Sequence, residues 1–149
     1  MKNRVLFLCT GNSCRSQMAE GLARSILDRN HNIQSAGSNP SHVNPYAVKT
    51  MAEIGIDISG HQSKSVDTID LSKVDIVITL CAEEVCPVVS GNIKRWHWPV
   101  SDPAGKGETE EQKLQCFREA RHSIHKMIQK CLPQLSGAAC GTDVGQNNI

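Results

Sequence analysis

A cysteine and an arginine lie six residues apart near the start of the chain, in the stretch CTGNSCRS that covers residues 9–16. The apolar run 5–8 comes directly before Cys9 and predicts a short strand buried on both faces. A helical pattern starts at Arg15, where apolar residues recur every four positions. Residues 9–14 are therefore predicted to form the loop between a strand and a helix. Backbone N–H groups without intrahelical partners, together with the helix dipole, make such a loop an anion-binding site.

The residue types in this loop suit an attack on a bound oxyanion. Gly11 permits a positive φ, with which successive N–H groups turn inward and form a nest for tetrahedral oxygens. The guanidinium of Arg15 donates two parallel hydrogen bonds to an oxyanion and stays charged. Positive surroundings stabilise a thiolate at Cys9, and Ser16 is expected to donate a hydrogen bond to its sulfur. We therefore predict that Cys9 is a nucleophile that attacks the central atom of a phosphate-like ion.

Zinc binding by Cys9 and Cys14 is the main alternative for this stretch. The rest of the sequence supplies no cysteine or histidine pair with the usual ligand spacing for the other half of a zinc site. Cys14 is instead expected to be a small buried residue. We predict no metal site and no cofactor.

Composition and charge argue against several classes of partner. The chain has 149 residues, which suits one domain, and its 16 Lys plus Arg balance 15 Asp plus Glu, so no basic stripe indicates nucleic acid. The apolar run near the N-terminus is shorter than that of a secretory signal, and no stretch is long enough to span a membrane. A cytoplasmic protein is expected, in which the seven cysteines serve as thiols rather than as a disulfide framework.

Strands and helices are predicted to alternate along the chain. Strands are expected at 5–8, 32–37, 74–80 and 92–100, with 74–80 near the centre of the sheet, and helices at 15–30, 45–54 and 110–132. This order predicts an α/β fold in three layers, with a central four-stranded parallel sheet and helices on both faces. A single domain is expected over 1–132, and residues 133–149 are expected to be a disordered tail. Cys9 and Cys81 each follow a strand, so both are predicted at the carboxyl edge of the sheet.

The spacing C-x5-R-S after the first strand resembles the signature loop of the low-molecular-weight tyrosine phosphatase fold, which matches Cys9, Asn12, Arg15 and Ser16. Within that fold, TLCAEEVCPVV at 79–89 and RWHWPVSDPAGKG at 95–107 resemble segments of the arsenate reductases. Phosphatases of this fold tend to have a tyrosine after Asp-Pro, where this chain has an alanine. The resemblance therefore implies an arsenate reductase of the low-molecular-weight phosphatase-like family, of the thioredoxin-coupled type.

The same resemblance implies roles for three cysteines. Cys9 attacks the arsenic of arsenate, Cys81 then attacks Cys9 so that arsenite leaves, and Cys86 attacks Cys81 in turn. Thioredoxin then reduces the disulfide between Cys81 and Cys86. Four residues separate these two cysteines, fewer than in many thioredoxin-linked members, so glutaredoxin with glutathione is an alternative electron donor.

The resemblance also assigns the remaining site residues. Asp102 of the Asp-Pro motif is the implied proton donor to the departing oxygen, with a turn residue before proline as the alternative. The residues expected to bind the oxyanion are Gly11, Asn12, Ser13, Cys14, Arg15 and Ser16. Some members hold potassium through residues that match Asn12, Glu20 and Ser35 together with an aspartate. Lys64 stands in place of that aspartate here, and its ammonium would substitute for the cation, so no potassium site is predicted.

Two other functions stay open from the sequence. A tyrosine phosphatase would use the loop of Cys9 and Arg15 without needing Cys81 or Cys86. A non-catalytic oxyanion-binding or arsenite-binding protein would use adjacent thiols, but such a protein does not need the arginine and the nest.

Overall fold

A computed structural model describes residues 4–27, 31–82 and 93–135 of the chain. Its strands are β1 (Arg4–Cys9), β2 (Asn32–Gly37), β3 (Ile76–Thr79) and β4 (Lys94–His97). Its α-helices are α1 (Arg15–Ile26), α2 (Pro45–Ala52), α3 (Glu110–Lys130) and α4 (Leu132–Leu135), and two short 3-10 helices, η1 (Val66–Thr68) and η2 (Leu71–Lys73), precede β3. The predicted roles of Cys86 and of the tail beyond residue 135 fall outside the described residues.

The four strands form one parallel sheet in the order β2-β1-β3-β4. As predicted, the stretch that includes β3 is central, because β3 pairs with β1 on one side and with β4 on the other. Cys9 lies opposite Gly37 of β2, and Leu8 lies opposite Thr79 of β3. This register brings the ends of three strands, and the residues that follow them, to the same edge of the sheet.

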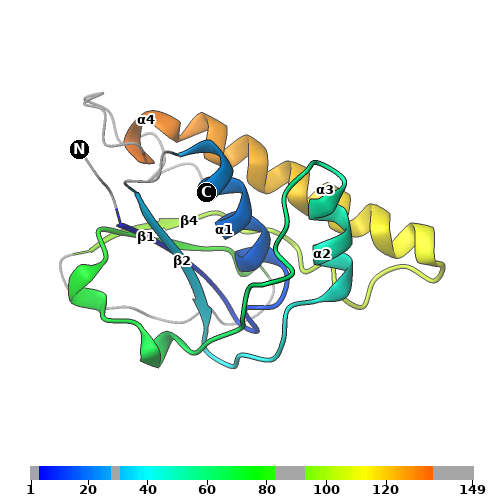
Figure 1. The fold of residues 1–149 in the computed structure, drawn as a ribbon, viewed down its shortest axis with the longest axis horizontal. Helices are drawn as coiled ribbons and strands as arrows, with labels where there is room; N and C mark the ends of the chain where they lie inside the picture. The colour runs from blue at the N-terminus through cyan, green and yellow to red at the C-terminus, as the bar shows by residue number, and fades with distance from the viewer. Residues whose placement is uncertain (1–3, 28–30, 83–92, 136–149) are drawn as a thin grey trace.

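The sheet separates two layers of apolar side chains. Val5 and Phe7 of β1 face a large core that includes buried residues of all four α-helices, which lie together on one side of the sheet in Figure 1. Leu6 and Leu8 face a smaller core, which Val66 and the rest of the η1 and η2 region cover. The alternation along β1 therefore explains why both faces of this strand are buried, as its continuous apolar run predicts.

The two tryptophans pack at the edge strand of the sheet. Trp96 lies in β4, which pairs with β3 alone, and Trp98 follows it. Both side chains are buried, and their rings stack with centroids 6.1 Å apart.

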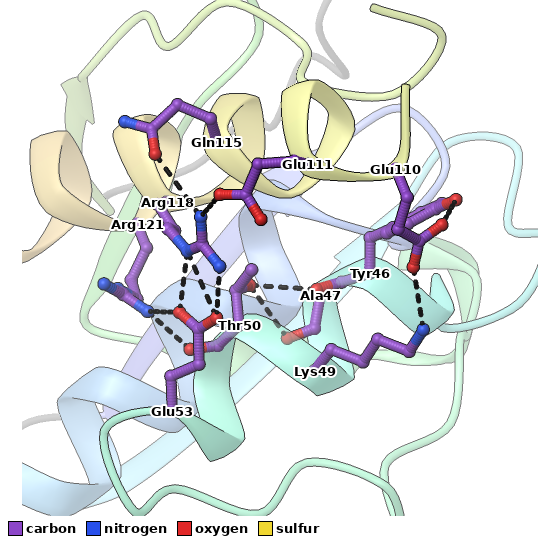
Figure 2. Close-up of polar contacts among 10 residues, drawn as sticks. All are labelled: Tyr46, Ala47, Lys49, Thr50, Glu53, Glu110, Glu111, Gln115, Arg118 and Arg121. Carbon is purple, nitrogen blue, oxygen red and sulfur yellow. Dashed lines mark hydrogen bonds and ion pairs between the residues drawn. The ribbon is translucent and has the colours of Figure 1, made fainter. Parts of the chain in front are cut away.

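A network of ion pairs joins α2 to α3 on the outside of the helical layer (Figure 2). Arg118 of α3 binds both carboxylate oxygens of Glu53, which caps α2, with its closest contact at 2.8 Å. Arg121 also reaches Glu53, at 3.1 Å. At the other end of α2, Tyr46 and Lys49 both contact Glu110, the first residue of α3. These contacts complement the apolar packing between Tyr46 and Phe117, whose ring centroids lie 5.6 Å apart.

Local sequence signals set the starts of two helices. Asn44 caps α2 through its side chain, with proline at the next position, both of which are common at helix starts. Thr109 and Gln112 form a capping box at the start of α3. These bonds satisfy backbone N–H groups that have no partner within the helix.

Three predictions of helix extent and burial differ from the structure. The first helix ends at Ile26 rather than residue 30, because Leu27 turns to an extended conformation and buries its side chain in the large core. In the helix predicted at 45–54, the apolar residues expected on the buried side are Val48, Met51 and Ala52. Ala52 is exposed instead, because the inner face of α2 carries Ala47, Thr50 and Met51. Residues 133–135, assigned to the tail, belong to α4, where Leu135 is fully buried. None of the helices in the described ranges is long and apolar enough to cross a membrane.

Candidate active site

The predicted anion-binding loop lies between β1 and α1. Cys9 ends β1 and is 2% exposed, and Arg15 begins α1. Cys14 occupies the N-cap position of α1 and makes no capping hydrogen bond through its side chain. The first turn of α1 therefore presents backbone N–H groups toward the loop, as an anion-binding site requires.

The loop turns at Asn12 and not at Gly11. Asn12 has a φ of 48°, in the left-handed region that asparagine tolerates better than most residues, whereas Gly11 has an ordinary backbone conformation. The prediction of a positive φ at Gly11 is therefore wrong. The physical reason is the segment behind the loop, where the backbone N–H of Lys64 donates to the side-chain oxygen of Asn12 and the hydroxyl of Ser63 donates to its backbone carbonyl. The bond from Lys64 uses the asparagine side chain, which a glycine lacks.

Gly37 of β2 lets the loop pass close to the sheet. A Cβ atom at this position would fall on the carbonyl oxygen of Thr10 and would lie 2.9 Å from the backbone nitrogen of Asn12. No larger residue therefore fits here without moving the loop. Sequence reasoning missed this residue, although a glycine at the end of the neighbouring predicted strand was a usable signal.

The sulfur of Cys9 is held from behind by a serine. Cys9 Sγ lies 2.9 Å from the hydroxyl of Ser16, which in turn accepts a hydrogen bond from the side chain of Asn12 at 2.8 Å. Both Asn12 and Ser16 are fully buried. They therefore support the loop and its sulfur, and neither belongs to the lining of the cavity described below.

The guanidinium of Arg15 is buried and ties the loop to two other segments. Its Nη1 donates to the carbonyl oxygens of Leu80 and Val100, at 3.4 and 3.0 Å. Its Nη2 lies 3.7 Å from a carboxylate oxygen of Asp102. The backbone carbonyls thereby orient the Arg15 guanidinium, which is only 4% exposed, so that it faces Asp102, the implied proton donor.

A cavity of about 460 Å³ opens beside Cys9. It is lined by Cys9, Thr10, Gly11, Ser13, Cys14, Arg15, Asn39, Ser41, Asp102 and Ala104. The structure thus gathers Cys9, Arg15 and Asp102 around one space, although Asp102 is more than eighty residues away from the loop in sequence. Asn39 and Ser41 were not predicted, because they come from a loop whose position is set by its hydrogen bonds to the carbonyls of Thr10 and Gly11.

Cys14 lines the cavity as a protonated thiol. It is 4% exposed, and burial raises the pKa of its thiol to about 12. A thiol with this pKa is protonated near neutral pH. Cys14 therefore contributes shape to the cavity and the backbone of the loop, in agreement with the prediction of a small buried residue.

Cys81 lies next to the nucleophilic loop, one residue beyond the carbonyl that binds Arg15. Its sulfur is 3.9 Å from the hydroxyl of Thr10. Cys81 is buried and disulfide-bonded, whereas Cys9, Cys14, Cys116 and Cys131 are free thiols.

The buried acid Glu20 is neutralised by protein groups. One carboxylate oxygen accepts a hydrogen bond from Ser35 at 2.6 Å, and the other lies 2.9 Å from the guanidinium of Arg24. The cationic partner of this carboxylate is thus Arg24, and Nδ1 of His61 lies 3.9 Å from the same oxygen. Across the described part of the chain, no group of three or more His, Cys, Asp or Glu residues is arranged to hold a metal ion.

Comparisons with known proteins agree with this geometry. Residues 4–139 match the family model described as low molecular weight phosphotyrosine protein phosphatase. An arsenate reductase of Halalkalibacterium halodurans is 48% identical over 130 residues, which cover 86% of this chain and 94% of that protein. A solved arsenate reductase in its phosphate-binding state has a TM-score of 0.77 and 34% identity, with 90% of this chain and 99% of the other covered. A thioredoxin-dependent arsenate reductase of Corynebacterium glutamicum has a TM-score of 0.65 and 25% identity, with 89% of this chain and 63% of the other covered.

The chain belongs to the low molecular weight phosphotyrosine protein phosphatase family. Within this family, the relatives named above are arsenate reductases. The resemblance found in the signature loop is therefore confirmed, as is the α/β fold with a four-stranded parallel sheet. The predicted enzyme class, arsenate reductase, is likewise the class of the relatives named above. The phosphatase alternative is supported by the family relation only.

Proposed function

We propose that this chain reduces arsenate to arsenite, with Cys9 as the nucleophile and with Cys81 and Cys86 as a disulfide relay that thioredoxin regenerates. The place of Cys81 carries the proposal, because its sulfur lies 3.9 Å from the hydroxyl of the residue next to the nucleophile. A phosphatase needs only the loop, whereas a reduction needs electrons from a second thiol beside it. The relatives that bear the name arsenate reductase support this function.

In the first step, the thiolate of Cys9 attacks arsenic, an As–S bond forms, and one arsenate oxygen leaves as water. The guanidinium of Arg15 and the N–H groups of the loop bind the remaining oxygens. Asp102, which lines the same cavity and faces Arg15, supplies a proton to the departing oxygen. The hydroxyl of Ser16 stabilises the sulfur of Cys9 before the attack.

In the second step, the thiolate of Cys81 attacks Sγ of Cys9. A disulfide forms, and the As–S bond breaks with both electrons remaining on arsenic, so As(V) becomes As(III) and arsenite leaves. The thiolate of Cys86 then attacks Cys81 and releases Cys9 as a thiolate.

Thioredoxin is the proposed electron donor, and its role would place the reaction in the cytoplasm. The relative of Corynebacterium glutamicum is described as thioredoxin-dependent, which supports this donor. Glutaredoxin with glutathione is the alternative, because of the short spacing between Cys81 and Cys86. The assay described next distinguishes the two electron donors.

The test is arsenate-dependent oxidation of NADPH with thioredoxin and thioredoxin reductase, compared with glutaredoxin, glutathione and glutathione reductase. Wild type is expected to turn over with thioredoxin, and Cys9→Ser, Cys81→Ser and Cys86→Ser are expected to lose turnover. Cys131→Ser, at a buried thiol on the far end of α3, is the matched control and should retain it. No turnover of the wild type with either donor would overturn the proposal, and turnover with glutaredoxin alone would overturn the choice of donor.

Hydrolysis of p-nitrophenyl phosphate separates the reductase from a phosphatase. Any hydrolysis is expected to need Cys9 and Arg15 and to survive Cys81→Ser, because phosphate transfer involves no disulfide. Phosphatase activity without arsenate reduction would favour the phosphatase instead.

A further inference from the structure

Gln17 is a fully buried polar side chain on the first turn of α1, behind the loop, and the proposed reaction gives it no role. Its Nε2 lies 3.2 Å from the carbonyl oxygen of Asn12, 3.1 Å from Oδ1 of Asn12 and 3.0 Å from the carbonyl oxygen of Gln62. Its Oε1 lies 3.0 Å from Nδ1 of His61. Every polar atom of this side chain therefore has a partner on the loop or on the segment 61–62 behind it.

Backbone groups determine the orientation of the Gln17 amide. Two of its neighbours are carbonyl oxygens, which can only accept, so the NH₂ group must face them. The oxygen then faces His61, whose Nδ1 must donate. Burial lowers the pKa of His61, whereas Glu20, 3.9 Å from Nδ1, raises it. The proton on Nδ1 that Gln17 requires is carried by the neutral ring in this tautomer and by the protonated ring alike.

The same reasoning determines the orientation of the Asn12 amide. Its Oδ1 accepts from Gln17 and from the backbone N–H of Lys64, the latter at 2.9 Å. Its Nδ2 must then donate to the hydroxyl oxygens of Ser16 and Ser35, at 2.8 and 3.0 Å. Ser35 passes its own proton on to the carboxylate of Glu20.

The direction of these bonds decides what Ser16 does. Because its oxygen accepts from Asn12, its single proton is left for Sγ of Cys9, 2.9 Å away. If the Asn12 amide were reversed, Oδ1 would face Ser16 and would compete with the sulfur for that proton.

We propose that Gln17, anchored by His61, is a positioning residue that acts with the backbone N–H of Lys64 to hold the Asn12 amide in the orientation in which the Ser16 hydroxyl donates to Cys9. Gln17 touches neither the cavity nor the sulfur, so it acts through Asn12 and Ser16. This inference rests on the proposed role of Cys9 as the nucleophile. According to this proposal, residues behind the loop influence the reactivity of the Cys9 thiolate.

The variant Gln17→Glu tests the proposal with almost no change of shape. A carboxylate lacks the NH₂ donor, so only the Lys64 N–H is left to hold Oδ1 of Asn12. The reversed amide, in which Ser16 donates to Oδ1 instead of to the sulfur, is then expected to become populated. The measurement is the pH profile of iodoacetamide alkylation of Cys9, followed by mass spectrometry in the reduced full-length chain. Loss of one hydrogen bond to a charged sulfur should move the midpoint upward by about one pH unit, or about tenfold less thiolate at neutral pH.

A double-variant comparison separates positioning from simple structural damage or from the new charge. In a Ser16→Ala background the shift caused by Gln17→Glu should vanish, because the bond it acts through is already absent. The ionisable groups on the cavity side, which are Cys14, Arg15 and Asp102, are the same in all variants. A shift of equal size in both backgrounds would overturn the proposal.

The neutral variant Gln17→Met keeps the test decisive if Gln17→Glu does not fold. It removes the donor without adding charge and should shift the midpoint in the same direction by a smaller amount. A folded Gln17→Met protein with the wild-type alkylation profile would also overturn the proposal. Since the assay uses no arsenate, its result does not depend on whether the chain reduces arsenate.

Discussion

Substitution of Gly37 by alanine should damage both stability and catalysis, because the loop leaves no room for a Cβ atom. The added carbon would fall on the carbonyl oxygen of Thr10 and would lie 2.9 Å from the nitrogen of Asn12 and from the carbonyl oxygen of Cys9. All three neighbours are backbone atoms of the nucleophilic loop, so no flexible side chain can move aside. The loop itself has to shift away from β2.

The expected cost follows from this overlap. Overpacking by one carbon typically lowers the free energy of unfolding by about 1–3 kcal/mol, and a rigid backbone places Gly37→Ala at the upper end. A displacement of the reacting group of roughly 1 Å costs about 100-fold in rate, so kcat/KM for arsenate should fall by about two orders of magnitude.

Gly60→Ala is the matched control for this substitution. A Cβ atom at Gly60 meets no atom within 4 Å, and its φ is not in the left-handed region. This variant should unfold at the wild-type urea concentration or slightly above it, since alanine restricts the unfolded chain. Urea unfolding and initial rates of arsenate-dependent NADPH oxidation measure both effects. If Gly37→Ala matches Gly60→Ala in midpoint and in kcat/KM, the loop does not depend on this contact and the reasoning is refuted.

Three further predictions concern the elements that carry the site. Hydrogen bonds from Arg118, and to a smaller extent from Arg121, hold the pKa of Glu53 below its usual value. The ionised carboxylate therefore stabilises the folded state above pH 4.5, and this contribution is lost as the pH falls through the lowered pKa. Glu53→Gln should therefore flatten the acid limb of a plot of unfolding free energy against pH, and an unchanged limb would refute it. Thr109→Ala removes the capping box of α3 and should lower the free energy of unfolding by about 1 kcal/mol in urea unfolding. Glu108→Ala is the control, because among the described contacts the Glu108 side chain makes no capping bond. Phe117→Ala, at a side chain 2% exposed, should cost about 3–5 kcal/mol in the same assay, and a cost below 1 kcal/mol would contradict the packing described for α3.

Much of the fold was predictable because its signals are local. The apolar run before Cys9 and the β-branched run that contains β3 both predict buried parallel strands, and they pair with each other in the sheet. The side chains of Asn44 and Thr109 cap the helices that follow them, so these helix starts can be found from a few residues. Once the strands are parallel, the meeting of Cys9 and Cys81 at one edge follows from topology alone.

The interior of the site was less predictable because it depends on segments that meet only in the folded chain. Glycine is the usual choice for a positive φ, yet Asn12 takes it, since the segment 63–64 binds its side chain and carbonyl. Asn39 and Ser41 reach the cavity because their backbones bond to the loop. Neither fact follows from the periodicity or spacing of nearby residues.

In the structure, residues that line the cavity lie on one side of the loop, and residues that hold the loop in its conformation lie on the other side. Arg15 and Asp102 face the cavity, whereas Gly37, Gln17 and Asn12 act from behind it. A phosphatase and a reductase need the same oxyanion cradle, so the cavity side alone does not distinguish them. In the proposed reaction the difference comes from the sulfur of Cys81, two residues beyond the end of β3, which lies 3.9 Å from the hydroxyl of Thr10 in the loop. Any change behind the loop that moves Thr10 should therefore alter the transfer from Cys9 to Cys81 even where oxyanion binding is retained.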